Sequence, residues 1–295
     1  MEVKQTRMKF QIYGKLAGLS RIDHGYGVRA GKTKNGNALK QAKFDVLVPN
    51  GNGQEDKFNL QITGYEREQV AYWDTELKQV GRVPWEERFG LPNNQRLFPI
   101  PYDAATDMEM ASDGDFYYLG GELQGNSFED RNGVQRNFIE FACDTARELF
   151  GGNNELKTIM KGDFVFNYAE PERKTIHGFL INYKGETTPI TFAWGGSDEA
   201  LEMVSKKVKF GTICHVVNGY IGKDYIEVKS DTSPKVTCDF GSLGEIEPTT
   251  TTRAVTKFVV VGMDVEKEQP PYSEQDLGLV KQEAEEDELT DDDLF

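Results

Sequence analysis

Alternating apolar and polar residues predict β-strands in the first part of the chain. In Lys57 to Gly64 (KFNLQITG), apolar residues occupy every second position, which is typical of a strand with one buried face. Met8 to Leu16 and Lys43 to Val48 alternate in the same way. The turn residues of Pro49 to Gly53 stand between the last two segments. We therefore expect an opening strand followed by a β-hairpin.

The same order of predicted strands recurs later in the chain. Residues 115–123 and 136–143 indicate a hairpin around the polar turn at Glu129 to Gly133, and a boundary follows near the glycines at 151–152. Beyond it, alternation or apolar runs predict strands at 162–168, 175–183, 188–194, 212–220, 224–228 and 254–263. The turn at 221–223 is expected to join two of these strands into a hairpin.

Helical spacing of apolar residues predicts three short helices. Arg67 to Gln79 places Val70, Trp73 and Leu77 at helical intervals. Asp144 to Phe150 and Ser197 to Lys207 are the other two expected helices. Two segments lack such a period: residues 17–42, rich in glycine and basic residues, predict a long exposed loop, and 81–112, with four prolines, predicts an irregular excursion.

The sequence thus predicts a mainly β protein with two copies of a unit of five or six strands and one helix. Short strands with turn signals and one helix after the third strand favour OB-fold-like Greek-key barrels, two in number, with a few short helices. The expected organisation is a first nucleic-acid-binding unit at 1–152, with the basic loop 17–43 and the insertion 81–112, a second OB-like unit at 153–265, and a disordered acidic tail at 266–295.

Charge is distributed unevenly along the chain. The formal net charge is −15 at pH 7, yet Met1 to Lys43 carries +8 from ten Lys or Arg and two acids. Ser273 to Phe295 carries −9 from ten acids and one Lys. A basic beginning and an acidic end indicate a nucleic-acid surface together with a tail.

The last thirteen residues, Glu283 to Phe295 (EAEEDELTDDDLF), contain eight carboxylates and no Lys or Arg. Mutual repulsion and the scarcity of apolar groups predict a disordered segment. Its tip ends in Leu294 and Phe295 after three aspartates. A solubilising tail is one interpretation, and a docking hook on an acidic arm is the other.

Catalytic and metal-binding patterns are missing from the sequence. We find no GxSxG, HExxH or Walker-type motif, and the three Cys and three His are scattered without metal-ligand spacing. We therefore predict a binding protein and not an enzyme, without cofactor or metal. No signal peptide opens the chain and no apolar run approaches the roughly 20 residues that cross a bilayer. A cytoplasmic protein is expected, in the host cytoplasm if a phage encodes it.

A basic groove with aromatic rings is the combination that binds single-stranded nucleic acid. The loop after the first strand offers clustered cations around Tyr26, although a solvated basic loop without a partner is the alternative. For each aromatic residue, packing in the core is an equally good interpretation. The candidate residues of the first unit are Arg21, Tyr26, Arg29, Lys32, Lys34, Lys40, Lys43, Tyr65 and Trp73. Those of the second unit are Tyr183, Lys184, Trp194, Lys206, Lys207, Tyr220 and Lys223.

With this tip, the chain resembles the single-stranded DNA-binding proteins of bacteria and their phages. Their acidic tails end in an aspartate run and an aromatic residue, as Asp291, Asp292, Asp293, Leu294 and Phe295 do here. The proline that usually precedes the bacterial Phe is missing, so a phage protein is the closer match. The resemblance implies a protein that coats single-stranded DNA during replication, recombination or repair. It also implies a tail that recruits polymerase, helicase or primase, in a monomer or small homo-oligomer.

Two other classes remain open on the sequence. A β-rich phage assembly protein would use the basic loop to bind an acidic partner. A nucleic-acid-processing enzyme such as a nuclease would need clustered carboxylates in its folded part, which the sequence does not offer.

Overall fold

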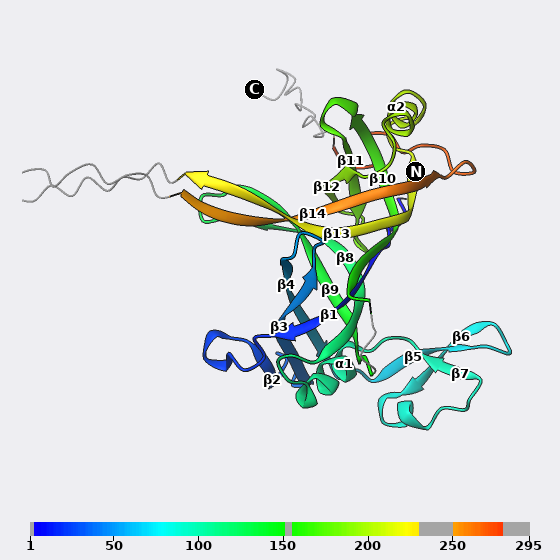
Figure 1. The fold of residues 1–295 in the computed structure, drawn as a ribbon. Coiled ribbons are helices and arrows are strands. Elements are labelled where there is room, and N and C mark those ends of the chain that lie inside the picture. The colour runs from blue at the N-terminus through cyan, green and yellow to red at the C-terminus, as the bar shows by residue number, and fades with distance from the viewer. Residues whose placement is uncertain (1–2, 151–154, 230–249, 280–295) are drawn as a thin grey trace, which may run out of the picture.

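The computed structural model describes residues 3–150, 155–229 and 250–279, and it is mainly β with few short helices. Eleven strands form one continuous sheet that curls into two barrels, the first below and the second above in Figure 1. A separate three-stranded sheet stands to the side. No helix of the described residues is long and apolar enough to span a membrane.

The first barrel closes through five strands in the order β1-β3-β4-β9-β8-β1. All neighbours are antiparallel except β4 and β9, which run parallel. The helix α1 (Pro101–Asp107) lies between the third and fourth of these strands in the chain. This connectivity is that of an OB-fold, a five-stranded Greek-key barrel. The strands are β1 Met8–Ala17, β3 Ala38–Pro49, β4 Glu55–Tyr65, β8 Phe116–Glu129 and β9 Gln135–Glu148.

The second barrel repeats this topology strand for strand. Its order is β10-β11-β12-β14-β13-β10, with β12 and β14 parallel and α2 (Asp198–Lys207) between the third and fourth strands. The predicted helix at Ser197 to Lys207 is confirmed, and the Ser197 hydroxyl caps it by accepting a hydrogen bond from the Ala200 amide. The strands are β10 Lys157–Glu170, β11 Thr175–Ile181, β12 Thr187–Trp194, β13 Ile213–Lys229 and β14 Thr250–Val265.

The first strands of the two barrels join them into one sheet. β1 pairs antiparallel with β10 from Met8 opposite Gly162 to Tyr13 opposite Lys157. Gly162 has a φ of 137°, and a Cβ there would lie 2.0 Å from the Arg7 carbonyl oxygen. Only glycine fits this close approach of two backbones.

Each barrel also sends its last hairpin across the other barrel. The β13–β14 ribbon passes over the β3–β4 hairpin, where buried Asp56 accepts hydrogen bonds from the Lys223 amide at 2.9 Å and the Tyr225 hydroxyl at 3.3 Å. On the other side β8 and β9 contact β12, and Phe141 of β9 contacts Phe258 of β14. The barrels therefore share one large apolar core.

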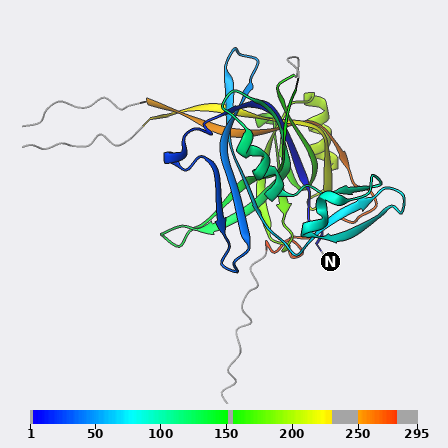
Figure 2. The same ribbon diagram turned by 90° about the horizontal axis from the view of Figure 1, so that it is seen from below.

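An insertion between β4 and α1 forms the separate sheet, in the order β6-β5-β7. It projects to the side of the first barrel in Figure 1, and Figure 2 shows it from below. Arg88 of the insertion and Asp103 of α1 form an ion pair between the insertion and this barrel. Val70, Val83 and Trp85 form its own small core. The sequence predicts that the insertion begins at residue 81. In the structure it begins earlier, before β5. Its elements are β5 Gln69–Asp74, β6 Gln79–Pro84, β7 Gln95–Leu97 and the 3-10 helix η2 Trp85–Gly90, and η3 Met108–Met110 follows α1.

Several predicted elements differ from the structure. The expected helix at Arg67 to Gln79 is the β5–β6 hairpin, and the one at Asp144 to Phe150 is the end of β9. The loop at 17–42 contains η1 Ile22–His24, β2 Gly27–Lys32 and the beginning of β3. β13 runs straight through the turn expected at 221–223. In each case pairing with a distant strand outweighs the local signal.

The segment 266–279 packs against the second barrel and is not part of a free tail. Tyr272 is 2% exposed and lies in a cluster with Val165, Phe179 and Leu277. The His215 imidazole contacts Asp163 at 2.5 Å and Glu266 at 3.5 Å, and the hydrogen bond to Asp163 raises the pKa of His215. The tail predicted from residue 266 is thus corrected as far as residue 279, and the rest of it lies outside the described residues. The 3-10 helix η4 (Pro171–Arg173) joins β10 to β11.

Candidate nucleic-acid interface

The outer surface of β2, β3 and β4 is the polar side of the first barrel. Even-numbered residues of β3 and β4 between Ala42 and Ile62 enter the core, so the odd-numbered ones point outward. Opposed residues of paired strands share a face, which groups their side chains across the three strands. We term this surface the open face. It carries Arg29, Gln41, Lys43, Asp45, Lys57, Asn59, Gln61 and Thr63.

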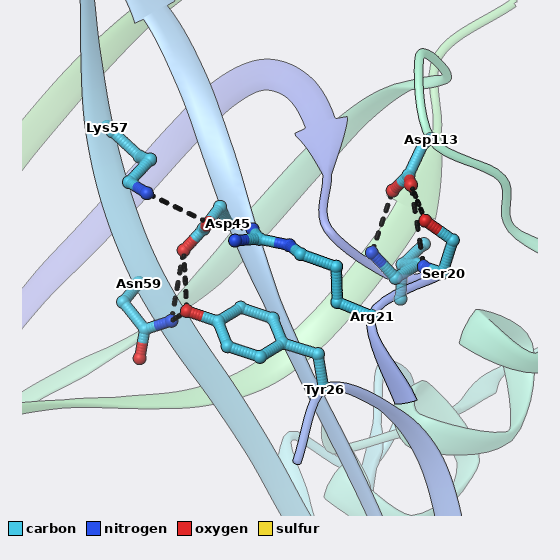
Figure 3. A network of polar contacts seen from close by, with 8 residues as sticks. Ser20, Arg21, Tyr26, Asp45, Lys57, Asn59 and Asp113 are labelled. Carbon is cyan, nitrogen blue, oxygen red and sulfur yellow. Dashed lines mark hydrogen bonds and ion pairs between the residues drawn. The ribbon is translucent and has the colours of Figure 1, made fainter. Parts of the chain in front are cut away.

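Asp45 is the centre of the open face (Figure 3). Its carboxylate is 1% exposed and accepts hydrogen bonds from Arg21, from the Tyr26 hydroxyl at 3.3 Å and from the Asn59 amide at 3.0 Å. The Lys57 ammonium lies 3.3 Å away. Burial by itself raises the pKa of Asp45, but these hydrogen bonds and Lys57 outweigh it, so its pKa lies below the ordinary value. The buried charge is thereby compensated.

Tyr26 is held over the open face by two cations. The Arg21 guanidinium lies 4.4 Å and the Lys43 ammonium 5.3 Å from the centre of its ring. The loop that carries Arg21 is anchored in turn, since Asp113 accepts hydrogen bonds from the Leu19 amide at 2.7 Å and the Ser20 hydroxyl at 2.6 Å. Figure 3 shows Arg21 beside Tyr26 and the contacts of Asp113 with the loop. An aromatic ring beside two cations is thus pre-positioned on this surface.

Only some of the other predicted residues of the first unit lie on or next to the open face. Arg29 belongs to the open face, and Lys32 and Lys34 are exposed next to it on β2 and its turn. Lys40 has the other parity on β3, and its ammonium pairs with Glu109 at 2.8 Å. The prediction for Lys40 is therefore wrong for this surface. Tyr65 ends β4 at the border of the insertion, and Trp73 is exposed on β5.

The predicted residues of the second unit are not gathered on one face. Trp194 is 8% exposed and donates a hydrogen bond to the Ser197 carbonyl at 2.8 Å, so its assignment as a stacking residue is wrong. The Lys223 ammonium lies over the Phe58 ring. Burial lowers the pKa of Lys223, although the negative charge of Asp56 acts to raise it. The remaining residues occupy three separate elements: the β11–β12 turn has Tyr183 and Lys184, α2 has Lys206 and Lys207, and β13 has Tyr220.

The equivalent face of the second barrel is partly covered by the chain itself. Phe179 and Ile181 of β11 pack against Tyr272 and Leu277 of the C-terminal segment. The Thr187 hydroxyl donates a hydrogen bond to the Leu277 carbonyl at 3.2 Å. Beyond this cover, Tyr168 stacks on His177 with 4.4 Å between ring centres. The same strand topology therefore presents a polar basic face in one barrel and a partly covered face in the other.

Sequence reasoning missed Lys57 and Asn59 as members of the interface. Both occupy outward positions of a strand that the alternation predicts correctly. The signal available in the sequence was a cation and an amide at alternate, outward positions of that strand. The tail residues 291–295 lie outside the described residues. In the described part of the chain, no group of three His, Cys, Asp or Glu could hold a metal ion.

With two OB-fold barrels, one of which has an open basic face, the chain belongs to the class of mainly β proteins built from OB-folds. The chain is a member of the YorF family, whose model matches residues 34–293. None of the curated proteins matches it.

Solved structures similar to the chain include the wild-type single-stranded DNA binding protein from Thermus aquaticus. It has 12% sequence identity and a TM-score of 0.46, and the match covers 92% of this chain and 98% of that one. A deletion mutant of the same protein has 13% identity and a TM-score of 0.44, with 90% and 98% coverage.

Proposed function

We propose that this protein binds single-stranded DNA without sequence specificity, through the open face of the first barrel. One observation carries the proposal: the exposed outer face of β2, β3 and β4 holds cations around a pre-positioned ring, Tyr26. In OB-folds, the face of the second and third strands is the one that binds oligonucleotides. In this barrel those strands are β3 and β4.

The chemistry of the face favours single strands over duplexes. Lys43 and Lys57 neutralise phosphates, a contact that carries no base information. Tyr26 offers a ring on which a base can stack, and stacking needs an unpaired base. Asn59 and Gln61 add hydrogen-bonding groups beside the ring. Non-specific binding to single strands uses this combination.

The first barrel is the main binding unit in this proposal. Its open face is exposed, whereas Tyr272 and Leu277 cover part of the equivalent face of the second barrel. The second barrel then acts mainly as structural support through the pairing of β1 with β10.

We also propose a role for the acidic tail and a cellular context. The carboxylates at 283–293 would compete with DNA for the open face, and Leu294 and Phe295 would recruit a replication protein. The activity is binding alone, without catalysis, in the cytoplasm of a bacterial cell and for a phage or host replication system. Coating of single strands in replication, recombination or repair is the corresponding biological role.

The test is a fluorescence anisotropy titration with labelled oligo(dT), duplex DNA and RNA across a range of salt concentrations. We expect the wild type to prefer single strands at low salt. The double variant Lys43→Ala with Lys57→Ala should bind oligo(dT) about tenfold more weakly or worse. Its salt dependence, d log K/d log [salt], should be shallower by about 1.4, since each lost phosphate contact removes about 0.7.

The matched control is Arg173→Ala with Lys267→Ala, which removes two exposed charges near the second barrel. Its salt dependence should stay at the wild-type value. Thermal unfolding verifies that each variant is folded. Equal losses of affinity for oligo(dT) in both double variants would refute the proposal. So would a lack of binding to oligo(dT) at low salt by the protein without Glu283 to Phe295.

A further inference from the structure

The insertion sheet has one apolar face and one face lined with arginines and rings. Ala71 of β5 is opposite Arg82, and Trp73 is opposite both Val80 and Arg96. These side chains share a face, because opposed residues of paired strands point the same way. The other face carries Val70 and Val83, which belong to the small core with Trp85. We term the first surface the insertion face.

A cleft separates the insertion face from the first barrel. Its volume is about 420 Å³, within the usual range of ligand sites. Thr63 and Tyr65 of β4 line one wall, and Arg82 and Phe98 line the other. The Phe98 amide donates a hydrogen bond to the Ala71 carbonyl at 3.1 Å, which attaches the Phe98 backbone to β5. Thr63 also belongs to the open face, so the cleft continues that surface toward the insertion.

The arginines on this side of the insertion are not neutralised. Within the described part of the chain, Arg67, Arg82 and Arg96 form no ion pair, and the Arg67 guanidinium lies 5.1 Å from the centre of the Tyr65 ring. Arg88 contrasts with them, since its guanidinium binds both carboxylate oxygens of Asp103 at 3.0 and 3.1 Å. The insertion therefore pairs its structural arginine and leaves three others available for an anion.

One carboxylate, Asp144, is among the residues that line the cleft. Burial raises its pKa, and the Thr145 hydroxyl donates a hydrogen bond to it at 2.7 Å. Arg67 and Arg82 line the same cleft. Two guanidinium groups against one carboxylate leave the cleft with an excess of positive charge.

Exposed aromatic rings accompany these cations. Trp73 is 38% exposed and stands between Val80 and Arg96 on the insertion face. Phe98 and Tyr65 are also exposed at the cleft. Trp73 remains exposed, although burial would remove its large apolar ring from water. An exposed large ring beside arginines is typical of a binding surface.

We propose that the insertion face and its cleft form a second segment of the single-stranded DNA path. This inference rests on the proposed function of the open face. Phosphates bind Arg67, Arg82 and Arg96, one base stacks on Trp73, and another enters the cleft between Tyr65 and Phe98. The DNA strand passes from the open face along Thr63 and Tyr65, and the insertion lengthens the stretch of DNA held by one molecule.

Tryptophan fluorescence tests the position of the DNA directly. The chain has three tryptophans, and Trp85 and Trp194 are only 6% and 8% exposed. Oligo(dT) should therefore quench mainly Trp73. In Trp73→Phe, which keeps a ring for stacking, the quenching should disappear while anisotropy still reports DNA binding. Quenching that persists in this variant, or a wild type that binds without quenching, overturns the inference.

The contribution of the arginines is tested with Arg82→Ala and Arg96→Ala together. Oligo(dT) lengths from about 4 to about 30 nucleotides cover the usual site sizes of one barrel and extend beyond them. We expect this double variant to bind the shortest oligonucleotides with the affinity of the wild type. For long ones the salt dependence should be shallower by about 1.4. The control is again Arg173→Ala with Lys267→Ala, and thermal unfolding verifies folding of each variant.

The two proposals fail in different ways. Unchanged binding of long oligonucleotides by the arginine variant overturns the insertion path, while a loss in Lys43→Ala with Lys57→Ala still supports the open face. Loss of binding to an acidic protein, with DNA binding intact, would assign the insertion face to a protein partner and also overturn the inference. If no variant and no wild-type protein binds DNA, the proposed function itself is wrong.

Discussion

Asp45 shows how a single residue organises the open face. It is a buried carboxylate on an outward position of β3, which costs free energy unless partners compensate the charge. Arg21, Tyr26 and Asn59 come to it from a loop and from β4. The residue therefore stabilises the fold and also positions the ring and one cation of the interface.

The pKa of Asp45 predicts a pH-dependent effect of its substitution. Because the pKa is lowered in the folded state, the contribution of Asp45 to stability is present above the ordinary value of 3.8 and is lost as pH falls through the folded value. Asp45→Asn should lower the free energy of unfolding by about 1 to 3 kcal/mol at pH 7. Urea unfolding at pH 7 and near pH 3 should show this difference shrinking at the acidic end.

Asp23→Asn is the matched control, since it removes the same charge from an exposed position in the same loop. It should change stability little at either pH. A deficit of Asp45→Asn that is equal at both pH values would contradict the assigned role of the charge.

Among the elements, the β5–β6 hairpin shows why local spacing misleads. Val70, Trp73 and Leu77 fit a helical period, but Val70 is buried in the insertion core, Trp73 faces outward and Leu77 lies in the turn. Asp74 stabilises that turn by accepting hydrogen bonds from the amides of Glu76 and Leu77. Pairing of β5 with both β6 and β7 decides the conformation.

The β1–β10 pairing is the element that joins the barrels, and Gly162 tests it. Gly162→Ala places a methyl group 2.0 Å from the Arg7 carbonyl oxygen and forces a φ of 137° on alanine. We expect a loss of roughly 3 kcal/mol or more in the free energy of unfolding, measured by urea denaturation.

Gly185→Ala provides the control for backbone strain alone. Gly185 has a φ of 81° in the β11–β12 turn, with open space around it, so its loss should be only about 1 to 2 kcal/mol. If both substitutions cost the same, the close contact between β1 and β10 is not what makes Gly162 necessary.

For the whole molecule, two barrels of identical topology present different outer surfaces. The C-terminal segment covers part of the second barrel, and the chain ends with sixteen residues beyond Leu279. The carboxylates at 283–293 follow in the sequence, and our proposal gives them the role of a tethered competitor for the open face.

Deletion of Glu283 to Phe295 should therefore tighten binding of oligo(dT), by roughly tenfold at low salt, because a tethered competitor is removed. The gain should fade as salt screens both interactions. Anisotropy titrations measure it. A full-length variant with amides in place of the eight carboxylates should behave like the deletion. Unchanged affinity in both proteins would remove the tail from the DNA-binding mechanism.

Local patterns in the sequence predict most of the barrel strands and the distribution of charge. Alternation in Lys57 to Gly64 is a local property, because side chains in a strand point to opposite faces in turn. The order of strands in each half, with one helix expected after the third strand, predicted mainly β, OB-fold-like barrels, although the helix expected in the first half at Arg67 to Gln79 is a β-hairpin. The basic character of residues 1–43 was equally visible in the composition.

The residues that share a surface are set by long-range contacts. Lys40 pairs with Glu109, Trp194 is buried, and Tyr272 covers the second barrel. Lys57 joins Tyr26 around a buried Asp45. The contacts of Lys40, Tyr272 and Lys57 connect residues that are separated in the chain, so no local pattern contains them. Such contacts leave the first barrel with an open basic face and close part of the equivalent face of the second.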